Sequence, residues 1–333
     1  MARQAKVSLA TASKVLNGRS GVSEETRERV RRAMRELGYR PTTTRADVPG
    51  STVTRITVIT SEIDSSMYYP EVLQTMLQTA DEHDMQVIIR LVGEVDTEDP
   101  DAVNAWAQSL LGGGSQGAVF ITCNLTEQQI RACEKVGLPL VGIDCYTLLD
   151  AGITSISANN FSGGYAAAQH LMSLGHTRIG LIIGSQTSTF ARERAYGFRA
   201  ALLDRGHTLP EEMVFHGHFN FETGALGGDY FLSMDEPPTA IAANCDSAAV
   251  GLMDSARKLG VRIPQDLSIV GFDDTKLSQW TTPQLTTVNQ PLAEIARMGI
   301  RTIRKLIRGE EPDSAHVQLA TRLVVRGSTA PIG

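Results

Sequence analysis

Residues 7–18 of the chain have the sequence Val-Ser-Leu-Ala-Thr-Ala-Ser-Lys-Val-Leu-Asn-Gly. Serine at position 8 is a residue type that caps helix N-termini, and Asn17-Gly18 is typical of a helix end. We therefore predict a short helix from about Leu9 to Leu16. Several of its side chains are small or carry hydroxyls, so such a helix can enter the major groove of DNA.

The predicted helix carries two kinds of DNA-contacting group. Ser8, Thr11 and Ser13 could donate hydrogen bonds to phosphates. Leu9, Ala10 and Lys14 could reach the edges of bases.

A second helix is predicted directly after the first. Ser23 can cap it, and Glu24 and Glu25 follow in the first turn, where the helix dipole favours negative charge. An apolar stripe at helical spacing follows, formed by Val30, Met34 and Leu37. Two short helices joined by a turn are typical of a DNA-binding head.

The charge of the chain is divided unevenly between this head and the remainder. The first 45 residues contain 11 Lys and Arg against 4 Asp and Glu, a balance of +7. The remaining residues contain 20 against 33, a balance of −13. A basic head on an acidic body predicts that the head alone meets a polyanion.

From Arg55 onward the pattern changes to short apolar strands that alternate with helices. Strands are predicted at 56–60, 87–91, 117–122, 139–143, 178–184, 212–216, 239–243 and 267–271. Helices are predicted near 69–83, 101–111, 126–136, 161–174, 191–205, 221–233 and 247–259. This alternation predicts two similar α/β lobes with parallel sheets, and a ligand cleft at the carboxyl ends of their strands.

Other classes of protein fit the sequence less well. No apolar run is long enough to span a membrane, and no secretory signal is present, so we expect a cytoplasmic protein. The four cysteines lack metal-ligand spacing and are expected to be buried or partly buried thiols. Phosphate-cradle and nucleophile-elbow motifs are absent as well, so we expect neither an enzyme nor a cofactor.

Several longer motifs strongly resemble the LacI/GalR family of transcriptional regulators. In the head these are V-S-x-A-T-x-S-x-V-L-N-G from Val7, G-V-S-E-E-T-R-E-R-V from Gly21 and L-G-Y-R-P ending at Pro41. In the core they are the segments 173–180, 191–198, 268–274, 283–291 and 323–329. The resemblance implies a helix-turn-helix head on a core of two Rossmann-like lobes, similar to a periplasmic sugar-binding protein.

The resemblance also implies a domain organisation and a homodimer. Residues 1–41 would form the head, 42–54 the hinge or linker, and 55–333 the effector-binding and dimerisation core. The N-lobe would comprise about 55–158 and 291–319, and the C-lobe about 159–290 and 320–329. A pair of heads would read the half-sites of a pseudo-palindromic operator.

Site residues are carried over by position. Phosphate contacts are implied for Ser8, Thr11, Ser13, Asn17, Ser23 and Tyr39, and base contacts for Leu9, Ala10 and Lys14.

The head departs from the family at both ends. The chain begins inside helix 1, so we expect a true start upstream of Met1. The hinge offers Val48, followed by Pro49, where the family usually has a Leu that wedges into the minor groove.

The implied effector site consists of Tyr68, Tyr69, Asp144, Arg192, Phe219, Cys245 and Asp273. Carboxylates at strand ends can accept paired sugar hydroxyls, an arginine can donate to vicinal oxygens, and aromatic rings can pack on a pyranose face. One residue is inserted before Tyr68, and Cys245 replaces a frequent Asn. These departures imply an effector other than the simplest hexoses.

The function that follows is a ligand-responsive repressor of carbohydrate genes that a mono- or oligosaccharide inducer releases from DNA. A regulator corepressed by a purine or another small molecule is the alternative. A sugar-binding transport protein would fit the core but not the basic head.

Overall fold

The computed structural model describes residues 5, 7, 8, 11, 23, 26, 29, 30, 53–60, 66–93, 95–123, 125–145, 153–185 and 188–332. The chain divides into two compact units, residues 1–53 and 54–333. Part of the predicted DNA contacts lies outside the described residues, namely Leu9, Ala10, Ser13, Lys14, Asn17, Tyr39 and Val48.

Both predicted helix caps in the first unit are confirmed. The hydroxyl of Ser8 accepts the N–H of Thr11 at 3.0 Å. The hydroxyl of Ser23 accepts the N–H of Thr26 at 3.4 Å. Val30, the first member of the predicted apolar stripe, is fully buried. Side-chain capping of this kind satisfies N–H groups that have no partner within the helix.

The first lobe of the second unit is built on a six-stranded sheet in the order β11-β5-β4-β3-β1-β2. The strands are β1 (Thr54–Thr60), β2 (Met85–Leu91), β3 (Gly117–Ile121), β4 (Leu140–Ile143), β5 (Thr154–Ala158) and β11 (His316–Leu319). All neighbouring pairs are parallel. Helices therefore have to cover both faces.

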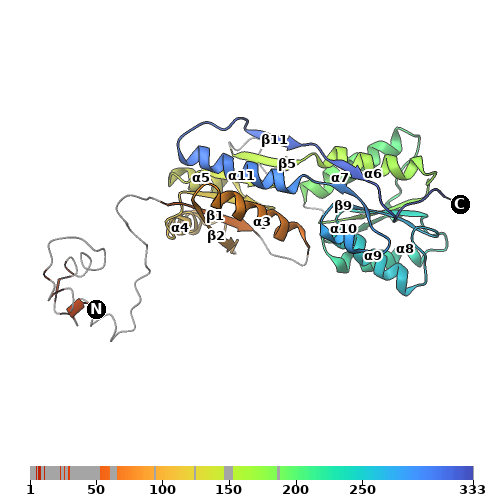
Figure 1. Cartoon of the computed structure of the whole chain (residues 1–333), viewed down its shortest axis with the longest axis horizontal. Helices are drawn as coiled ribbons and strands as arrows, with labels where there is room; N and C mark the ends of the chain where they lie inside the picture. The colour runs from red at the N-terminus through yellow and green to blue at the C-terminus, as the bar shows by residue number, and fades with distance from the viewer. Residues whose placement is uncertain are drawn as a thin grey trace. The chain divides into compact units, whose positions relative to one another are not determined.

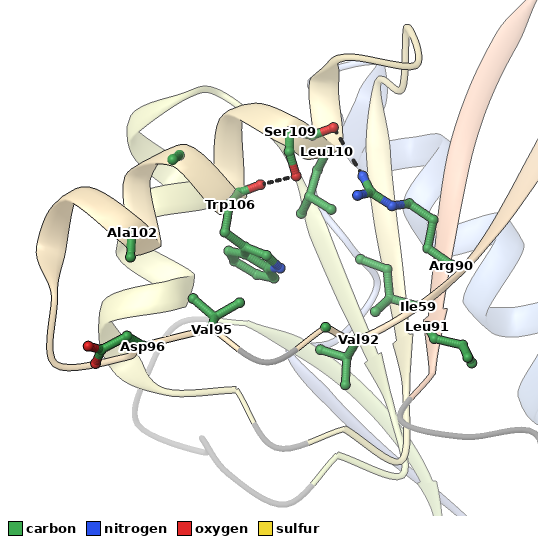
Figure 2. A pocket seen from close by; sticks show the side chains of 12 residues that line it. Ile59, Arg90, Leu91, Val92, Val95, Asp96, Ala102, Trp106, Ser109 and Leu110 are labelled. Atoms are coloured by element: carbon green, nitrogen blue, oxygen red, sulfur yellow. Dashed lines mark hydrogen bonds between the residues drawn. The ribbon is translucent and has the colours of Figure 1, made fainter.

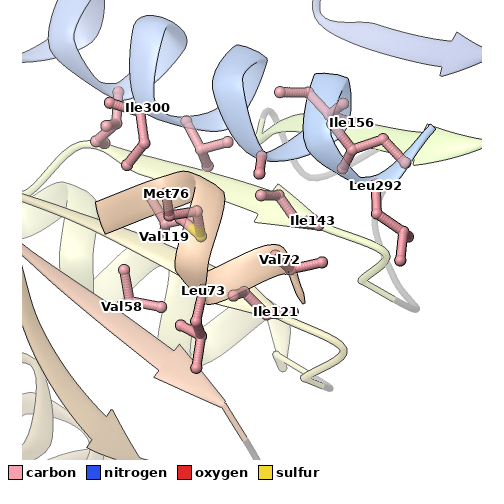
Figure 3. Packing of buried hydrophobic residues seen from close by; sticks show 14 of the residues in the cluster. Val58, Val72, Leu73, Met76, Val119, Ile121, Ile143, Ile156, Leu292 and Ile300 are labelled. Atoms are coloured by element: carbon pink, nitrogen blue, oxygen red, sulfur yellow. The ribbon is translucent and has the colours of Figure 1, made fainter. Parts of the chain in front are cut away.

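Alternate residues of the central strands point to opposite faces of this sheet. On one face α3 (Tyr68–Asp81) and α11 (Leu292–Ile307) bury side chains such as Met76 and Ile300 against Val58, Val119 and Ile143 (Figure 3). Ile59 and Phe120 face the other way and pack in the cluster formed by α4 (Pro100–Leu111) and α5 (Glu127–Lys135).

A second six-stranded sheet forms the other lobe, in the order β12-β10-β9-β8-β6-β7. Its strands are β6 (Ile179–Ile183), β7 (Val214–His216), β8 (Ala240–Ala243), β9 (Ser268–Asp273), β10 (Thr286–Asn289) and β12 (Arg322–Val324). Its helical segments are α6 (Asn160–Ser173), α7 (Thr189–Leu203), η1 (Glu211–Met213), α8 (Phe221–Leu232), α9 (Asp246–Lys258) and α10 (Lys276–Trp280). Only the β10–β12 pair within this described sheet is antiparallel.

The chain passes between the lobes after β5, after β10 and after β11. Elements from the end of the sequence, including α11 and β11, thereby lie in the same lobe as β1 (Figure 1). At two of these crossings, the N–H of Asn159 donates to the carbonyl of Leu319 at 2.8 Å. This bond holds the connecting segments that follow β5 and β11 side by side.

The predicted fold class is confirmed, and each predicted strand and helix of the core is present with shifted ends. The prediction missed β5, β10, β11, β12, α10 and α11, and the first residues of the strand predicted at 212–216 belong instead to the short helix η1. Each lobe thus has six strands where about four were expected. No helix among the described residues is both long and apolar enough to cross a membrane.

Candidate ligand site

Polar residues gather where the central strands of the two sheets end. Thr122 follows β3, Asp144 follows β4, and Asp273 is the last residue of β9. Their φ angles are 50°, 46° and 111°, in the left-handed region that favours glycine. Such conformations cost of order 1–3 kcal/mol each and concentrate at functional sites. The strain therefore marks this edge of both sheets as a candidate site.

Two tyrosines at the start of α3 form the wall from the first lobe. The hydroxyl of Tyr68 donates to the carboxylate of Asp144, and that of Tyr69 shares a hydrogen bond with the hydroxyl of Thr122. Their rings meet edge to face, with centroids 5.4 Å apart. The structure thus brings together three of the predicted effector residues, Tyr68, Tyr69 and Asp144.

Arg194 on α7 is the central residue of the wall from the second lobe. Its Nε donates to Oδ1 of Asn160 at 2.8 Å, and its Nη1 donates to the carbonyl of Asn244 at 2.5 Å. The same Nη1 lies 3.5 Å from Oδ1 of Asp273. The guanidinium stacks on Phe272, 3.8 Å from the ring centroid. Arg194 is therefore fixed by contacts on several sides.

Arg192, the arginine predicted from the sequence, lies elsewhere on α7. It is exposed, and its guanidinium donates to the hydroxyl of Thr189 at 3.3 Å. Arg194 is the arginine that the structure brings to Asp273, and the sequence analysis missed it. Helical spacing was the available signal, because Arg194 shares the buried face of α7 with Phe190 and Phe198.

Asp273 sits in a buried network that sets its charge. Nε2 of Gln290 donates to its Oδ1 at 2.6 Å. Burial raises the pKa of Asp273 to about 7, against the opposing effects of Arg194 and Gln290, and Asp144 raises it further. Burial is also the main cause of the raised pKa of Asp144 and of the strongly raised pKa of Tyr68. These shifts follow from removing charges from water.

Asp246 at the start of α9 is a further buried carboxylate next to this network. It accepts hydrogen bonds from the hydroxyl of Thr287 at 2.5 Å and from the backbone N–H of Thr275 at 2.7 Å. Burial, followed by the proximity of Asp273, raises the pKa of Asp246 well above its ordinary value. Its contacts fix the loop that follows β9 and so position Asp273.

Three buried polar atoms around the network have no hydrogen-bond partner among the described residues. They are Oδ1 of Asp144, Nδ2 of Asn244 and Oε1 of Gln290. Each of these residues has a second polar group that is hydrogen-bonded within the network: Asp144 to Tyr68, Asn244 to Arg194 and Gln290 to Asp273. Because buried polar atoms are nearly always paired, two acceptors and one donor in this place point to a polar ligand.

The remaining two predicted effector residues follow strands of the second lobe, Phe219 after β7 and Cys245 after β8. The ring of Phe219 covers Gly184 so closely that a Cβ there would lie 2.6 Å from it, and the ring centroid is 5.7 Å from the guanidinium carbon of Arg194. Cys245 is buried and caps α9, its Sγ accepting the N–H of Ala248 at 3.3 Å. The described contact of the Cys245 thiol is therefore with its own helix.

The two walls are close enough to influence each other. The positive charge of Arg194 lowers the pKa of Asp144, and the charge of Asp273 adds to the raised pKa of Tyr68. A direct contact joins the lobes nearby, where Oε1 of Glu71 accepts the backbone N–H of Lys276 at 2.8 Å. We call Tyr68, Tyr69, Asp144, Arg194, Asp273 and Gln290 the inter-lobe site.

A separate hollow of about 440 Å³ lies in the first lobe between α4 and the end of β2 (Figure 2). Trp106, Val92 and Val95 face into it, and Arg90 at its edge donates to the carbonyl of Ser109 at 3.0 Å. It has no buried charged residue and none of the unpaired polar atoms. The inter-lobe site is therefore the better candidate for a specific polar ligand.

All four cysteines are free thiols, and all but the half-buried Cys145 are buried, as predicted. Burial raises the pKa of the Cys133 thiol to about 12. Thiolate chemistry at neutral pH is disfavoured by this shift.

Comparisons with known proteins agree with this architecture. The family model described as bacterial regulatory proteins, lacI family, matches residues 1–42, and the periplasmic binding protein-like domain matches residues 168–329. The HTH-type transcriptional regulator DegA of Bacillus subtilis (strain 168) is 33% identical over 336 residues, covering 100% of this chain and 97% of that protein.

Two solved structures superpose on nearly the whole chain. The transcriptional regulator CelR–cellobiose complex has a TM-score of 0.74 at 27% identity, covering 98% of each chain. The lac repressor dimer bound to operator and the anti-inducer ONPF has a TM-score of 0.73 at 27% identity, covering 99% of this chain and 97% of that one.

Proposed function

Because the chain belongs to the lacI family of bacterial regulatory proteins, we propose that it represses genes of carbohydrate uptake or catabolism until a sugar inducer binds. As a member of that family it is a ligand-responsive DNA-binding regulator and not an enzyme. Regulators of this family bind operator DNA and small-molecule effectors and form dimers.

The observation that carries the sugar proposal is the set of unpaired buried atoms on Asp144, Asn244 and Gln290. A sugar hydroxyl both donates and accepts, so a ring with several hydroxyls could satisfy two acceptors and one donor at once. The rings of Tyr68, Tyr69 and Phe219 supply apolar surface for the faces of a pyranose. The similar structure that holds cellobiose supports the same ligand class.

We assign effector contact to Tyr68, Tyr69, Asp144, Phe219 and Asp273, with Arg194 in place of Arg192. Arg194 is buried, and its guanidinium contacts both the Asp273 carboxylate and the ring of Phe272. A buried, pre-oriented guanidinium loses little freedom when it binds a ligand oxygen.

For DNA we propose a homodimer whose two heads, residues 1–41, read the halves of a pseudo-palindrome. Base reading is assigned to Leu9, Ala10 and Lys14. Phosphate contacts are assigned to Ser8, Thr11, Ser13, Asn17, Ser23 and Tyr39, and a minor-groove contact to Val48 in the linker 42–54. The +7 balance of the first 45 residues supports this assignment.

The test uses two conservative variants of neighbouring arginines. Operator duplexes are first selected from random sequence with the full-length protein, and sugars are screened for release of the selected duplex. Arg194→Lys should keep operator affinity within about 3-fold but weaken the sugar response at least about 10-fold, because an ammonium group cannot reproduce the planar set of guanidinium donors. The matched control Arg192→Lys should behave as the unaltered protein.

Three results would contradict the proposal. Failure to prefer any palindromic duplex over random competitor would remove the DNA-binding assignment. Release by none of the sugars would remove the carbohydrate assignment. A response lost in Arg192→Lys and kept in Arg194→Lys would reverse the assignment of the two arginines.

A further inference from the structure

The inter-lobe site holds more negative than positive groups. Asp144 and Asp273 are buried in it, and Glu193, which precedes Arg194 on α7, is half-buried. Glu193 is near enough to Asp144 for that carboxylate to raise its pKa, although burial is the larger cause. The buried cation in this described part of the molecule is Arg194, and its Nε and Nη1 already donate to Asn160, Asn244 and Asp273.

Neighbouring positive charges do not correct this excess. Arg192 and Lys276 are both exposed, and Arg192 donates to Thr189.

Helix N-termini near the site already carry side-chain caps. Such termini bind phosphate through unpaired backbone N–H groups. Here Ser188 caps α7 by accepting the N–H of Ala191, and Asn159 caps α6 by accepting that of Ser162. At α9 the cap is Cys245, and the first turn contains the carboxylate of Asp246.

We propose that the inter-lobe site selects uncharged polyhydroxylated ligands and rejects the phosphate esters of the same sugars. The inference rests on the proposed sugar-binding function and narrows its ligand class. Hydroxyls can donate to Asp144 and Asp273 and so favour their charged forms. A phosphate dianion would instead bring like charge to two buried carboxylates, where water screens poorly.

The test compares matched pairs of ligands on the full-length protein at pH 8, where phosphate monoesters are dianions. Glucose with glucose 6-phosphate, trehalose with trehalose 6-phosphate, and fructose with fructose 1-phosphate are titrated by calorimetry, with inorganic phosphate as a further probe. We expect any sugar that binds to do so at least about 100-fold more tightly than its ester, and inorganic phosphate not to compete.

Each outcome separates this inference from the proposed function. An ester that binds as tightly as its parent, or competition by millimolar inorganic phosphate, would overturn the charge selectivity while leaving a sugar regulator intact. If no parent sugar binds but an ester does, both proposals fail. If none of the probes binds, no sugar is selected over its ester, and both the carbohydrate proposal and the charge selectivity fail for these ligands.

A pair of variants tests whether the carboxylates cause the selectivity. Glu193→Gln removes one negative charge next to Asp144 without changing the size of the side chain, and we expect the sugar-to-ester affinity ratio to fall about 10-fold. Glu212→Gln makes the same change at an exposed position of η1 and should leave the ratio unchanged. An unchanged ratio in Glu193→Gln would contradict the assignment.

Discussion

At the scale of single residues, burial disfavours the charged form of the Asp273 carboxyl group. Its pKa of about 7 in the folded protein compares with an ordinary value of 3.8. The folded protein therefore binds this proton more tightly than the unfolded chain does. The resulting stabilisation is complete below about pH 4 and is lost as the pH rises through 7, and it amounts to at most about 4 kcal/mol.

Asp273→Asn should remove this dependence. The free energy of unfolding of the variant relative to the unaltered protein should rise by a few kcal/mol between pH 5 and pH 8. Urea unfolding at a series of pH values measures the difference. Asp235→Asn, the same change at an exposed position, serves as the control. A difference between variant and parent that stays constant over this range would show that Asp273 titrates normally.

The sequence predicted the carboxylates of the site better than its arginine. Asp144 and Asp273 were found because both follow apolar strands, and the carboxyl ends of parallel strands meet at one edge of a sheet. Choosing between Arg192 and Arg194 requires the rotation of α7 about its axis. That rotation is set by the burial of Phe190 and Phe198 against a sheet whose position the sequence does not give.

At the scale of elements, glycines determine how closely α6 approaches α7. A Cβ added to Gly197 would lie 1.9 Å from the carbonyl oxygen of Phe161, and one added to Gly164 would lie 2.0 Å from that of Arg194. Backbone contacts of this kind leave no flexible group that could move aside. They also connect the position of Arg194 directly to the packing of the two helices.

Gly197→Ala should therefore destabilise the protein by about 2 kcal/mol or more, as overpacking does. The sign is informative, because alanine in an isolated helix is about 1 kcal/mol better than glycine. Chemical denaturation gives the magnitude, and the response to sugar should weaken because Arg194 moves. Gly93→Ala, where nothing lies within 4 Å of the new Cβ, is the control. A Gly197→Ala variant as stable as the parent would rule out the close approach.

The missed elements differ in how far the sequence could have revealed them. Buried residues of α11 recur at helical spacing from Leu292 to Ile303, so its pattern was visible. By contrast, β11 and β12 are four and three residues long and only partly buried. β11 exists because it pairs with β5, about 160 positions earlier in the chain. Pairing over such a separation leaves no local pattern.

At the scale of the whole molecule, the net charge of −6 gives the wrong expectation for a DNA-binding protein. What matters is that cations are concentrated in the first 45 residues, because ionic screening limits attraction to roughly 10 Å at 0.1 M salt. The −13 balance of the remainder weakens nonspecific contact of the core with DNA and leaves the head to bind. This division could be predicted entirely from the sequence.

The division predicts that position, and not charge alone, decides the effect of removing a cation. Lys14→Ala in the head should weaken operator binding at least about 10-fold and reduce the preference for operator over random duplex, because a base contact is worth 1–3 kcal/mol. Arg308→Ala removes the same charge from the exposed end of α11 and should change neither quantity. Fluorescence anisotropy over a range of salt concentrations measures the operator affinity and the preference over random duplex. For the unaltered protein, the logarithm of the affinity should fall against the logarithm of the salt concentration with a slope of about −0.9 per phosphate contacted, despite the negative net charge. Equal losses in the two variants would show that the position of the cation does not matter. An affinity independent of salt would show that phosphate contacts do not carry the binding.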